Sequence, residues 1–176
     1  MSFHVVNSRI AWLLEESAPE KGEALGIPAN THLWMGSGPG LEIKKSQGKD
    51  FELEAVRQGP AELGEVVFTD GSPLGFKHLI HAVVMGQDLQ WAEGAGDRAG
   101  EAFLRECAAR KIGHVVTHPF HRGVTTASMD PLREMLGSFL RVMEEGIAVE
   151  NVTVLVKDIE ERNLLQNLFL QLLTGS

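Results

Sequence analysis

The sequence has 176 residues, of which 43% are hydrophobic and 23% charged, and its formal net charge at pH 7 is -8. Both fractions are close to globular averages, which argues against a disordered chain, and the length leads us to expect a single domain over residues 1–176. The acidic charge argues against a general nucleic-acid binder, because that function needs clustered Lys and Arg.

Short β-branched runs alternate along the chain with longer segments of helical period. Strands are predicted at Phe3–Val6, Ala24–Ala29, Glu65–Thr69, His78–Val84, Ile112–Thr117 and Val152–Lys157. These runs are short and mostly apolar, as expected when both faces of a sheet are covered. The alternation therefore predicts an α/β domain with helices packed on a largely parallel sheet.

Amphipathic helices are predicted between and after these strands. Ala99–Ala109 and Leu132–Met143 each place their apolar residues on one face. In the last segment, Asp158 stands at an N-cap position, Glu161 follows three residues later, and apolar residues then repeat at helical spacing. This pattern predicts a C-terminal packing helix. Loops are predicted at Pro19–Gly22 and Gly94–Gly96.

A glycine turn, Gly36-Ser37-Gly38-Pro39-Gly40, follows the strand Ala24–Ala29 and opens a helix that begins near Leu41. Such a turn exposes backbone N–H groups at the positive end of the helix dipole, which favours an anion and most often a phosphate. The turn lacks the Lys-Ser or Lys-Thr of a P-loop and the spacing of G-x-G-x-x-G. By itself it leaves open a purely structural strand-to-helix connection.

The run from Ala29 to Gly48, Ala-Asn-Thr-His-Leu-Trp-Met-Gly-Ser-Gly-Pro-Gly-Leu-Glu-Ile-Lys-Lys-Ser-Gln-Gly, resembles the signature of the macro-domain family. In that signature an Ala-Asn pair precedes a run of glycines and a helix that ends in Gly. A second similar block runs from Gly64 to the Ile80-His81 pair. The resemblance implies a three-layer α/β/α fold with a mixed, mostly parallel sheet. It also implies a cleft at the carboxyl ends of the strands that binds ADP-ribose, which some members remove from proteins or small molecules.

The resemblance further implies where a ligand contacts the chain. Asn30 would face a ribose, the glycine turn one phosphate, and the segment around Arg122 a second phosphate. The implied ligand-binding residues are Asn30, Gly36, Ser37, Gly38, Pro39, Gly40, His121, Arg122, Gly123, Val124 and Thr125. The expected partner is therefore ADP-ribose or another phosphate-bearing nucleotide, with no cofactor and no metal.

Several positions depart from the family pattern. Ile27 stands where the hydrolases carry their first Asn, and Gly40 stands where they carry an Asp implicated in hydrolysis. Arg9, which cannot accept a hydrogen bond, aligns with the Asp that reads the adenine amino group. His121-Arg122-Gly123 replaces a Ser-Thr-Gly loop and adds positive charge, which favours a phosphate. The resemblance thus implies ligand binding without hydrolase activity.

Three histidines, His114, His118 and His121, are predicted at the end of one strand and in the loop that follows. With Arg122 they form either an anion site or an acid–base pair. A metal site is disfavoured, because the spacing fixes no third ligand and no Cys pair accompanies it. The alternative function is hydrolysis of an ADP-ribosyl ester or phosphoester with His118 or His121 as the base. In the plainer interpretation, His114 is a strand residue and His118 caps a loop.

The remaining candidates have mostly structural interpretations. His81, inside an apolar strand, is interpreted as a core histidine, and Cys107 as a core thiol. Trp34, beside the glycine turn, either stacks on a base or packs. A third alternative is a degenerate cleft, filled by Arg9 or Ile27, in a domain that serves in assembly, and the apolar C-terminal helix leaves a homo-oligomer open.

The cellular setting is inferred from three features of the sequence. Its apolar runs are far shorter than the ~20 residues of a membrane span. The N-terminus lacks the basic region and apolar core of a secretory signal. The lone cysteine excludes an intramolecular disulfide, which fits a reducing compartment. We therefore expect a soluble, cytoplasmic protein with no membrane partner.

Overall fold

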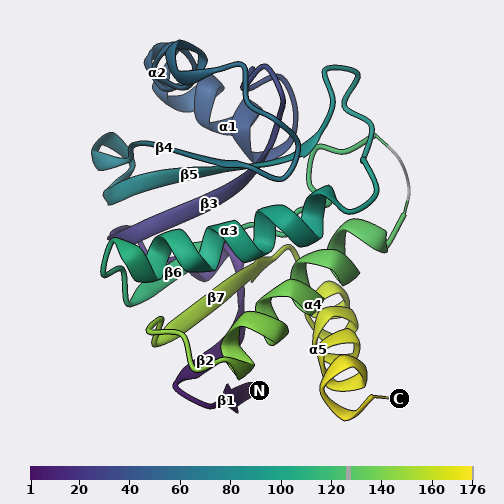
Figure 1. Cartoon of the computed structure of the whole chain (residues 1–176). Coiled ribbons are helices and arrows are strands. Elements are labelled where there is room, and N and C mark those ends of the chain that lie inside the picture. The colour runs from purple at the N-terminus through teal and green to yellow at the C-terminus, as the bar shows by residue number, and fades with distance from the viewer. Residues whose placement is uncertain (126–127, 176) are drawn as a thin grey trace.

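A computed structural model describes residues 1–125 and 128–175 of the chain (Figure 1). Its strands are β1 Ser2–Val5, β2 Ser8–Leu14, β3 Gly22–Asn30, β4 Val66–Asp70, β5 Phe76–Met85, β6 His114–Thr117 and β7 Asn151–Val156. Its helices are α1 Gly38–Gln47, α2 Asp50–Gln58, α3 Ala95–Ala109, α4 Asp130–Glu144 and α5 Ile159–Thr174, with short 3-10 helices at Glu15–Ser17 and Ser72–Leu74.

The strands form one seven-stranded sheet in the order β1-β2-β7-β6-β3-β5-β4. The five central strands, from β2 to β5 in this order, are mutually parallel. The two edge strands, β1 and β4, pair antiparallel with their neighbours. The predicted mixed, mostly parallel sheet is therefore confirmed.

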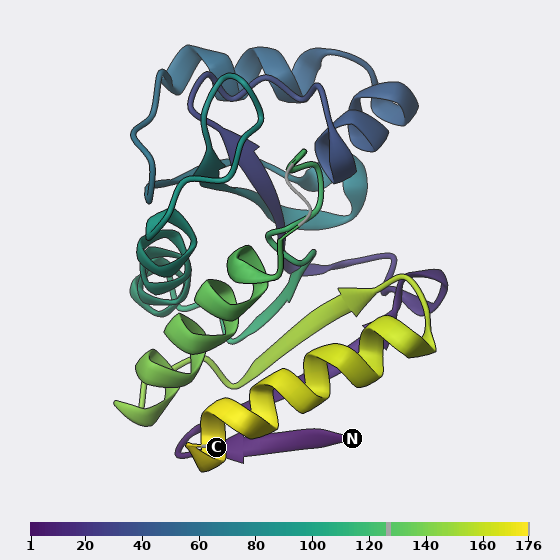
Figure 2. The same cartoon turned by 90° about the vertical axis from the view of Figure 1, so that its right-hand side faces the viewer.

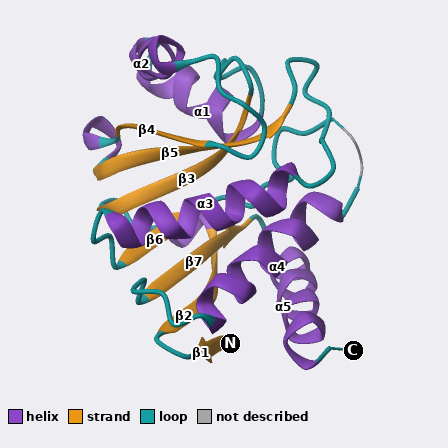
Figure 3. Ribbon diagram, in the orientation of Figure 1, coloured by secondary structure: helices purple, strands orange, loops and turns teal. Residues whose placement is uncertain are grey.

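Helices cover both faces of this sheet (Figure 3). The helices α3, α4 and α5 pack on one face over the largest apolar cluster, and α1 and α2 cover the other face over two smaller clusters. Along β3 the side chains alternate between these faces, since Ala24 belongs to the first cluster while Leu25 and Ile27 belong to the second. The expected three-layer α/β/α fold is confirmed.

Gly26 lets the sheet and α3 approach each other closely. A Cβ built on Gly26 would lie 2.5 Å from the ring of Phe103 on α3 and 2.5 Å from the hydroxyl of Thr117. Any side chain there would push α3 away from β3, because neither neighbour is free to yield in a packed core. The approach of α3 thus depends on a glycine inside a strand.

The C-terminal helix forms as its capping pattern predicts. The Asp158 carboxylate accepts a hydrogen bond from the backbone N–H of Glu161 at 2.8 Å. Leu165 and Phe169 are fully buried, and Figure 2 shows α5 lying along β1 and β2 near the two chain termini. No helix among the residues that the structure describes is long and apolar enough to cross a membrane.

The sequence analysis predicted neither β2 nor α2. The prediction of a loop at residues 94–96 is partly wrong, because α3 begins at Ala95. The carboxylate of Glu134 on α4 accepts hydrogen bonds from the N–H groups of Gly94 and Gly96 at 2.9 Å. This distant side chain stabilises a helix start that has no local capping residue.

Candidate functional site

A cleft lies where the central parallel strands end, because their carboxyl ends reach the same edge of the sheet. Four connections border it. Glu15 follows β2, a first loop of residues 31–37 follows β3, and a second loop of residues 118–125 follows β6. The start of α5, with Glu161, follows β7.

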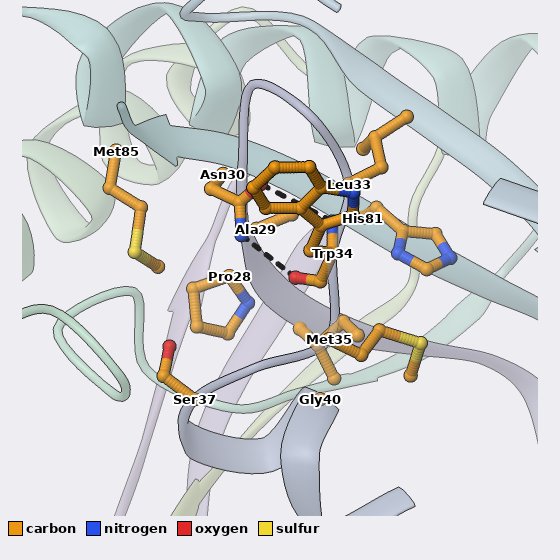
Figure 4. A pocket seen from close by; sticks show the side chains of 11 residues that line it. Pro28, Ala29, Asn30, Leu33, Trp34, Met35, Ser37, Gly40, His81 and Met85 are labelled. Carbon is orange, nitrogen blue, oxygen red and sulfur yellow. Dashed lines mark hydrogen bonds between the residues drawn. The ribbon is translucent and has the colours of Figure 1, made fainter. Parts of the chain in front are cut away.

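Asn30 organises the first loop from inside. Its side-chain amide donates to the carbonyl of Trp34 at 2.7 Å, and its amide oxygen accepts from the N–H of Trp34 at 3.3 Å (Figure 4). The same oxygen accepts from the N–H of His32 at 3.0 Å. Asn30 is buried, and Leu33 in the same turn has a left-handed backbone with φ of 64°. The expected contact between Asn30 and a ribose stays a prediction.

A second anchor of the first loop comes from α2. One carboxylate oxygen of Glu52 accepts the N–H of Met35 at 2.7 Å and the ammonium of Lys44 at 3.0 Å. Trp34 stacks on His32 with ring centroids 4.8 Å apart, and 47% of Trp34 is exposed. The first loop is therefore fixed on its inner side and presents an aromatic surface outward.

The two loops touch each other across the cleft. Helix α1 begins at Gly38, earlier than predicted, and Gly38 has φ of 55°. A Cβ on Gly38 would lie 2.9 Å from the Cα of Gly123, and a Cβ on Gly123 would lie 2.8 Å from the hydroxyl of Ser37. Only glycines allow this approach, because both backbones are left-handed and have no free space for a side chain.

The rest of the second loop is tied into the chain. The N–H of Val124 bonds to the carbonyl of His121 at 3.3 Å, and the N–H of Thr125 bonds to the carbonyl of Leu89 at 3.0 Å. The Thr125 hydroxyl also contacts Gln90 at 2.8 Å. These bonds occupy two N–H groups that we expected to face a phosphate.

The glycine turn borders two separate pockets. Beneath the first loop lies an inner pocket of about 10 Å³, bordered among others by Ile27, Asn30, Met35 and His81 (Figure 4). That space holds about one water molecule. On the other side of Gly38 lies an outer pocket of about 360 Å³. Its apolar lining consists of Leu25, Pro39 and Ile43, and its polar lining of Glu15, Glu42, Ser46, His118 and Arg122.

Arg122 lies in an ion-pair network behind the outer pocket. Its Nη2 is 2.6 Å from a carboxylate oxygen of Glu161 and 3.2 Å from one of Glu15. Its Nε is buried without a hydrogen-bond partner among the described residues. Burial alone would raise the pKa of Glu161, but hydrogen bonds from His121 and from the Lys157 N–H, with the charge of Arg122, lower it to about 2.

His118 lies beside this network. Its Nδ1 is 3.5 Å from a Glu15 carboxylate oxygen, longer than a normal hydrogen bond. Burial, with a smaller effect from the charge of Arg122, lowers the pKa of His118 to about 4, so the ring is neutral at pH 7. His121 Nε2 lies 3.6 Å from the Glu161 carboxylate. The second loop thus brings His118, His121 and Arg122 together, as predicted.

Two sequence expectations about this cleft are wrong. His114 is the first residue of β6, at the edge of the sheet opposite the cleft, and its Nε2 lies 3.5 Å from a carboxylate oxygen of Glu150. It therefore does not lie with His118 and His121. Arg9 lies near the amino end of β2, paired in register with Asn151, and does not fill the cleft. The causes differ: His114 is at the amino end of a correctly predicted strand, whose carboxyl end leads to the cleft, whereas β2 was not predicted at all.

The structure adds acidic residues that sequence reasoning missed. Glu15 and Glu42 line the outer pocket, and Glu161 holds Arg122 from behind. Placing β2 correctly would have pointed to Glu15, because it directly follows that strand. No local signal marks the contact of Glu161 with a loop 39 residues earlier in the chain.

The two residues interpreted as core are buried. His81 is fully buried with Nε2 2.9 Å from the Thr69 hydroxyl, and burial lowers the pKa of His81 to about 4. Its Nδ1 has no hydrogen-bond partner among the described residues. Cys107 is fully buried, and burial raises the pKa of its thiol to about 12, which makes it a poor nucleophile. Within the described ranges, no group of three or more His, Cys, Asp or Glu could hold a metal ion.

Residues 28–136, more than half of the chain, match the model of the Macro domain. The chain belongs to the macro domain family. Among curated proteins, uncharacterised proteins of Aquifex aeolicus and Aeropyrum pernix are 41% identical over 92 residues and 38% identical over 65 residues. These matches cover 52% and 37% of this chain, and 56% and 34% of the relatives. The chain therefore matches only a portion of each relative.

Solved macrodomains share the fold at low identity. The Oceanobacillus iheyensis macrodomain with MES bound superposes with a TM-score of 0.81 at 18% identity, covering 100% of this chain and 98% of that chain. The same macrodomain with ADP superposes with a TM-score of 0.81 at 18% identity, covering 100% of this chain and 97% of that chain. The macrodomain of Mycobacterium tuberculosis DarG superposes with a TM-score of 0.66 at 20% identity, covering 84% of this chain and 97% of that chain.

Proposed function

We propose that this macro domain binds a phosphate-bearing nucleotide of the ADP-ribose class in the outer pocket. One observation carries the proposal: the N-terminus of α1 and the guanidinium of Arg122 border the same pocket, next to the contact of the two glycine loops. The first turn of a helix leaves its N–H groups without partners inside the helix. Pro39 has no N–H, and the Leu41 N–H bonds to the Ser37 carbonyl. The start of α1 therefore offers the N–H groups of Gly38 and Gly40 to an anion.

The composition of the pocket supports a nucleotide over a bare anion. Leu25, Pro39 and Ile43 provide an apolar surface on which a base can lie. The carboxylates of Glu15 and Glu42 can accept hydrogen bonds from amino or hydroxyl groups of a nucleoside. Macrodomain structures of the same fold are described with ADP and, for a mutant, with ADPR.

The first loop supports binding without hydrolysis. Ile27 is buried and has no group that could place a water molecule. Gly40 has no side chain, so it offers no carboxylate that could move a proton. The proposal therefore includes no reaction at the inner pocket.

Calorimetric titration with AMP, ADP, ADP-ribose and inorganic phosphate tests binding. We expect heat from at least one nucleotide and a drop in its affinity of about tenfold in Arg122→Gln, the size of one charge-assisted hydrogen bond. Arg133→Gln is the matched control, because Arg133 lies on the exposed surface of α4 and, among the residues that the structure describes, forms an ion pair only with its neighbour Asp130. Absence of heat from every nucleotide would contradict the proposal.

A second candidate function rests on His118. A neutral imidazole that lines the outer pocket beside the Glu15 carboxylate has the arrangement of a general base with an orienting acid. His118 would take a proton from water, the hydroxide would add to the carbonyl carbon or phosphorus of a bound ester, and the alcohol would leave with that proton. Release of ADP-ribose from an ester-linked substrate that disappears in His118→Ala favours this reaction. Turnover that persists unchanged in that variant rejects it.

A further inference from the structure

The cleft is divided, and this division limits the size of the ligand. Gly38 and Pro39 line the outer pocket of about 360 Å³, and Ser37 and Gly40 of the same turn line the inner pocket of about 10 Å³. A ligand that fills only the outer pocket needs no movement of the loops. A ligand that reaches both pockets has to pass this turn, which is packed against Gly123 of the second loop.

The inner pocket is closed by side chains that belong to the core. Ile27 and Leu33 are 1% and 0% exposed, and Met35 and Met85 are 3% and 2% exposed. All four border the inner pocket. A pentose has about ten non-hydrogen atoms, whereas the inner pocket has room for about one water molecule. A second sugar therefore cannot enter unless this region of the core opens.

The first loop is also fixed against opening. Asn30 bonds the loop backbone three times from below, and Glu52 holds the N–H of Met35 while paired with Lys44. Moving the loop outward would break these bonds and expose Leu33 and Met35. Both effects oppose a ligand that has to open the inner pocket.

The charges around the outer pocket favour a single phosphate. Among the described residues that line it, Arg122 is the one cationic side chain, because His118 is neutral at pH 7. Glu15 and Glu161 already compensate its charge, and Glu42 adds a further carboxylate. A first phosphate can gain from Arg122 and the start of α1, while a second one would meet like charge.

We infer that this site takes a nucleoside monophosphate, and that the second phosphate and second ribose of ADP-ribose add nothing to binding. The inference rests on the proposed function and narrows its ligand class. The base lies on the apolar lining of the outer pocket, and the phosphate lies between Arg122 and the N-terminus of α1. The inner pocket stays closed in the complex.

Calorimetric titration of the whole chain with adenosine, AMP, ADP and ADP-ribose tests the inference. We expect AMP to bind about tenfold tighter than adenosine, and ADP and ADP-ribose to bind no tighter than AMP. ADP-ribose that binds tenfold or more tighter than AMP overturns the inference and leaves the proposed function intact. Failure of all three nucleotides to bind instead overturns the proposed function.

A pair of variants tests the role of the inner pocket. Ile27→Ala enlarges that pocket, so we expect the affinity for ADP-ribose relative to AMP to rise at least threefold. Ile80→Ala is the matched control, because Ile80 is equally buried but belongs to the cluster under α3 and lines neither pocket. If Ile27→Ala fails to fold, Ile27→Val should move the ratio in the same direction by less. If the ratio of the affinities for ADP-ribose and AMP is the same in the folded Ile27 variant and in the control, the inference is contradicted.

Discussion

Arg122 is held between carboxylates from two distant regions of the chain, Glu161 at the start of α5 and Glu15 after β2. Only 7% of Glu161 is exposed, so its charge is stabilised by its partners and not by water. The same carboxylate accepts the N–H of Lys157 at 3.1 Å. One residue thereby joins the second loop to the C-terminal helix and shapes the wall of the outer pocket.

Replacing Glu161 with Gln should lower the free energy of unfolding at pH 7 by about 1–3 kcal/mol, since the charge-assisted hydrogen bond from Arg122 is weakened. Because the pKa of Glu161 is lowered from 4.5 to about 2, its stabilisation is complete above pH 4.5 and is lost as the pH falls toward 2. Urea unfolding should therefore show a smaller difference in the free energy of unfolding between wild type and Glu161→Gln at pH 3 than at pH 7. Glu160→Gln, on the exposed side of the same turn, is the control, and equal effects of the two variants would refute the role of Glu161.

His81 predicts a second pH effect on stability. Burial lowers the pKa of His81 from 6.5 to about 4, so unfolding takes up a proton between these values. The stabilisation is complete above pH 6.5 and is lost as the pH falls toward 4. His81→Gln should flatten the dependence of the free energy of unfolding on pH between 6.5 and 4, whereas replacement of the exposed His4 by Gln should not. Identical slopes in wild type and His81→Gln would rule the effect out.

The first loop and α2 act together at the scale of elements. Glu52 lies on α2 and fixes both the backbone of Met35 and the side chain of Lys44 on α1. Its side chain is 16% exposed, so these interactions are partly shielded from water. The position of the first loop thus depends on a helix that contributes nothing to the lining of either pocket.

Glu52→Ala should lower the free energy of unfolding by about 1–3 kcal/mol, because a shielded N–H loses its acceptor. Glu52→Gln should lower the free energy of unfolding by less, since an amide oxygen can still accept the hydrogen bond from the N–H of Met35. Chemical denaturation of the two variants measures both values. Glu106→Ala provides a comparison on α3, where an exposed ion pair contributes about 0.3–0.5 kcal/mol. An Ala variant at position 52 that is as stable as the Gln variant would show that the Met35 bond is unimportant.

The sequence allowed prediction of elements whose signals are local. The Asp158 cap and the apolar spacing predict α5, and short apolar runs predict the strands buried on both faces. Strand β2 was missed because it mixes the exposed Arg9 with the buried Ile10 and Trp12, unlike a fully apolar central strand. Helix α2 is only nine residues long and lacks a side-chain cap.

In the candidate site, too, only the features with a local signal in the sequence were predictable. The glycine turn predicted a helix after β3, although α1 begins at Gly38 and not near Leu41, and the second loop was placed opposite it. The ion pairs of Arg122 join residues 39 positions apart and over a hundred positions apart, and no periodicity reveals such contacts. The size of the inner pocket depends on how Ile27 and Met35 pack, which is a property of the folded core.

At the scale of the whole molecule, the fold places one cleft at the edge where its parallel strands end. Two helical layers cover the sheet faces, so the connections after β2, β3, β6 and β7 meet at this edge and are free to form a site (Figures 1 and 2). The glycine turn, packed against Gly123, lines both an inner and an outer pocket of this cleft. The fold that this chain shares with solved macrodomains thus carries, here, a cleft lined by Glu15, Glu42 and Arg122.

A crystal structure of the chain soaked with AMP tests the central claim most directly. We predict density for the base against Leu25 and Ile43 in the outer pocket, and density for the phosphate between Arg122 and the first turn of α1. The contact between Gly38 and Gly123 should remain closed, with no sugar beneath the first loop. Density for the nucleotide in an opened inner pocket, or an outer pocket that holds only solvent at a saturating concentration of AMP, would contradict the account.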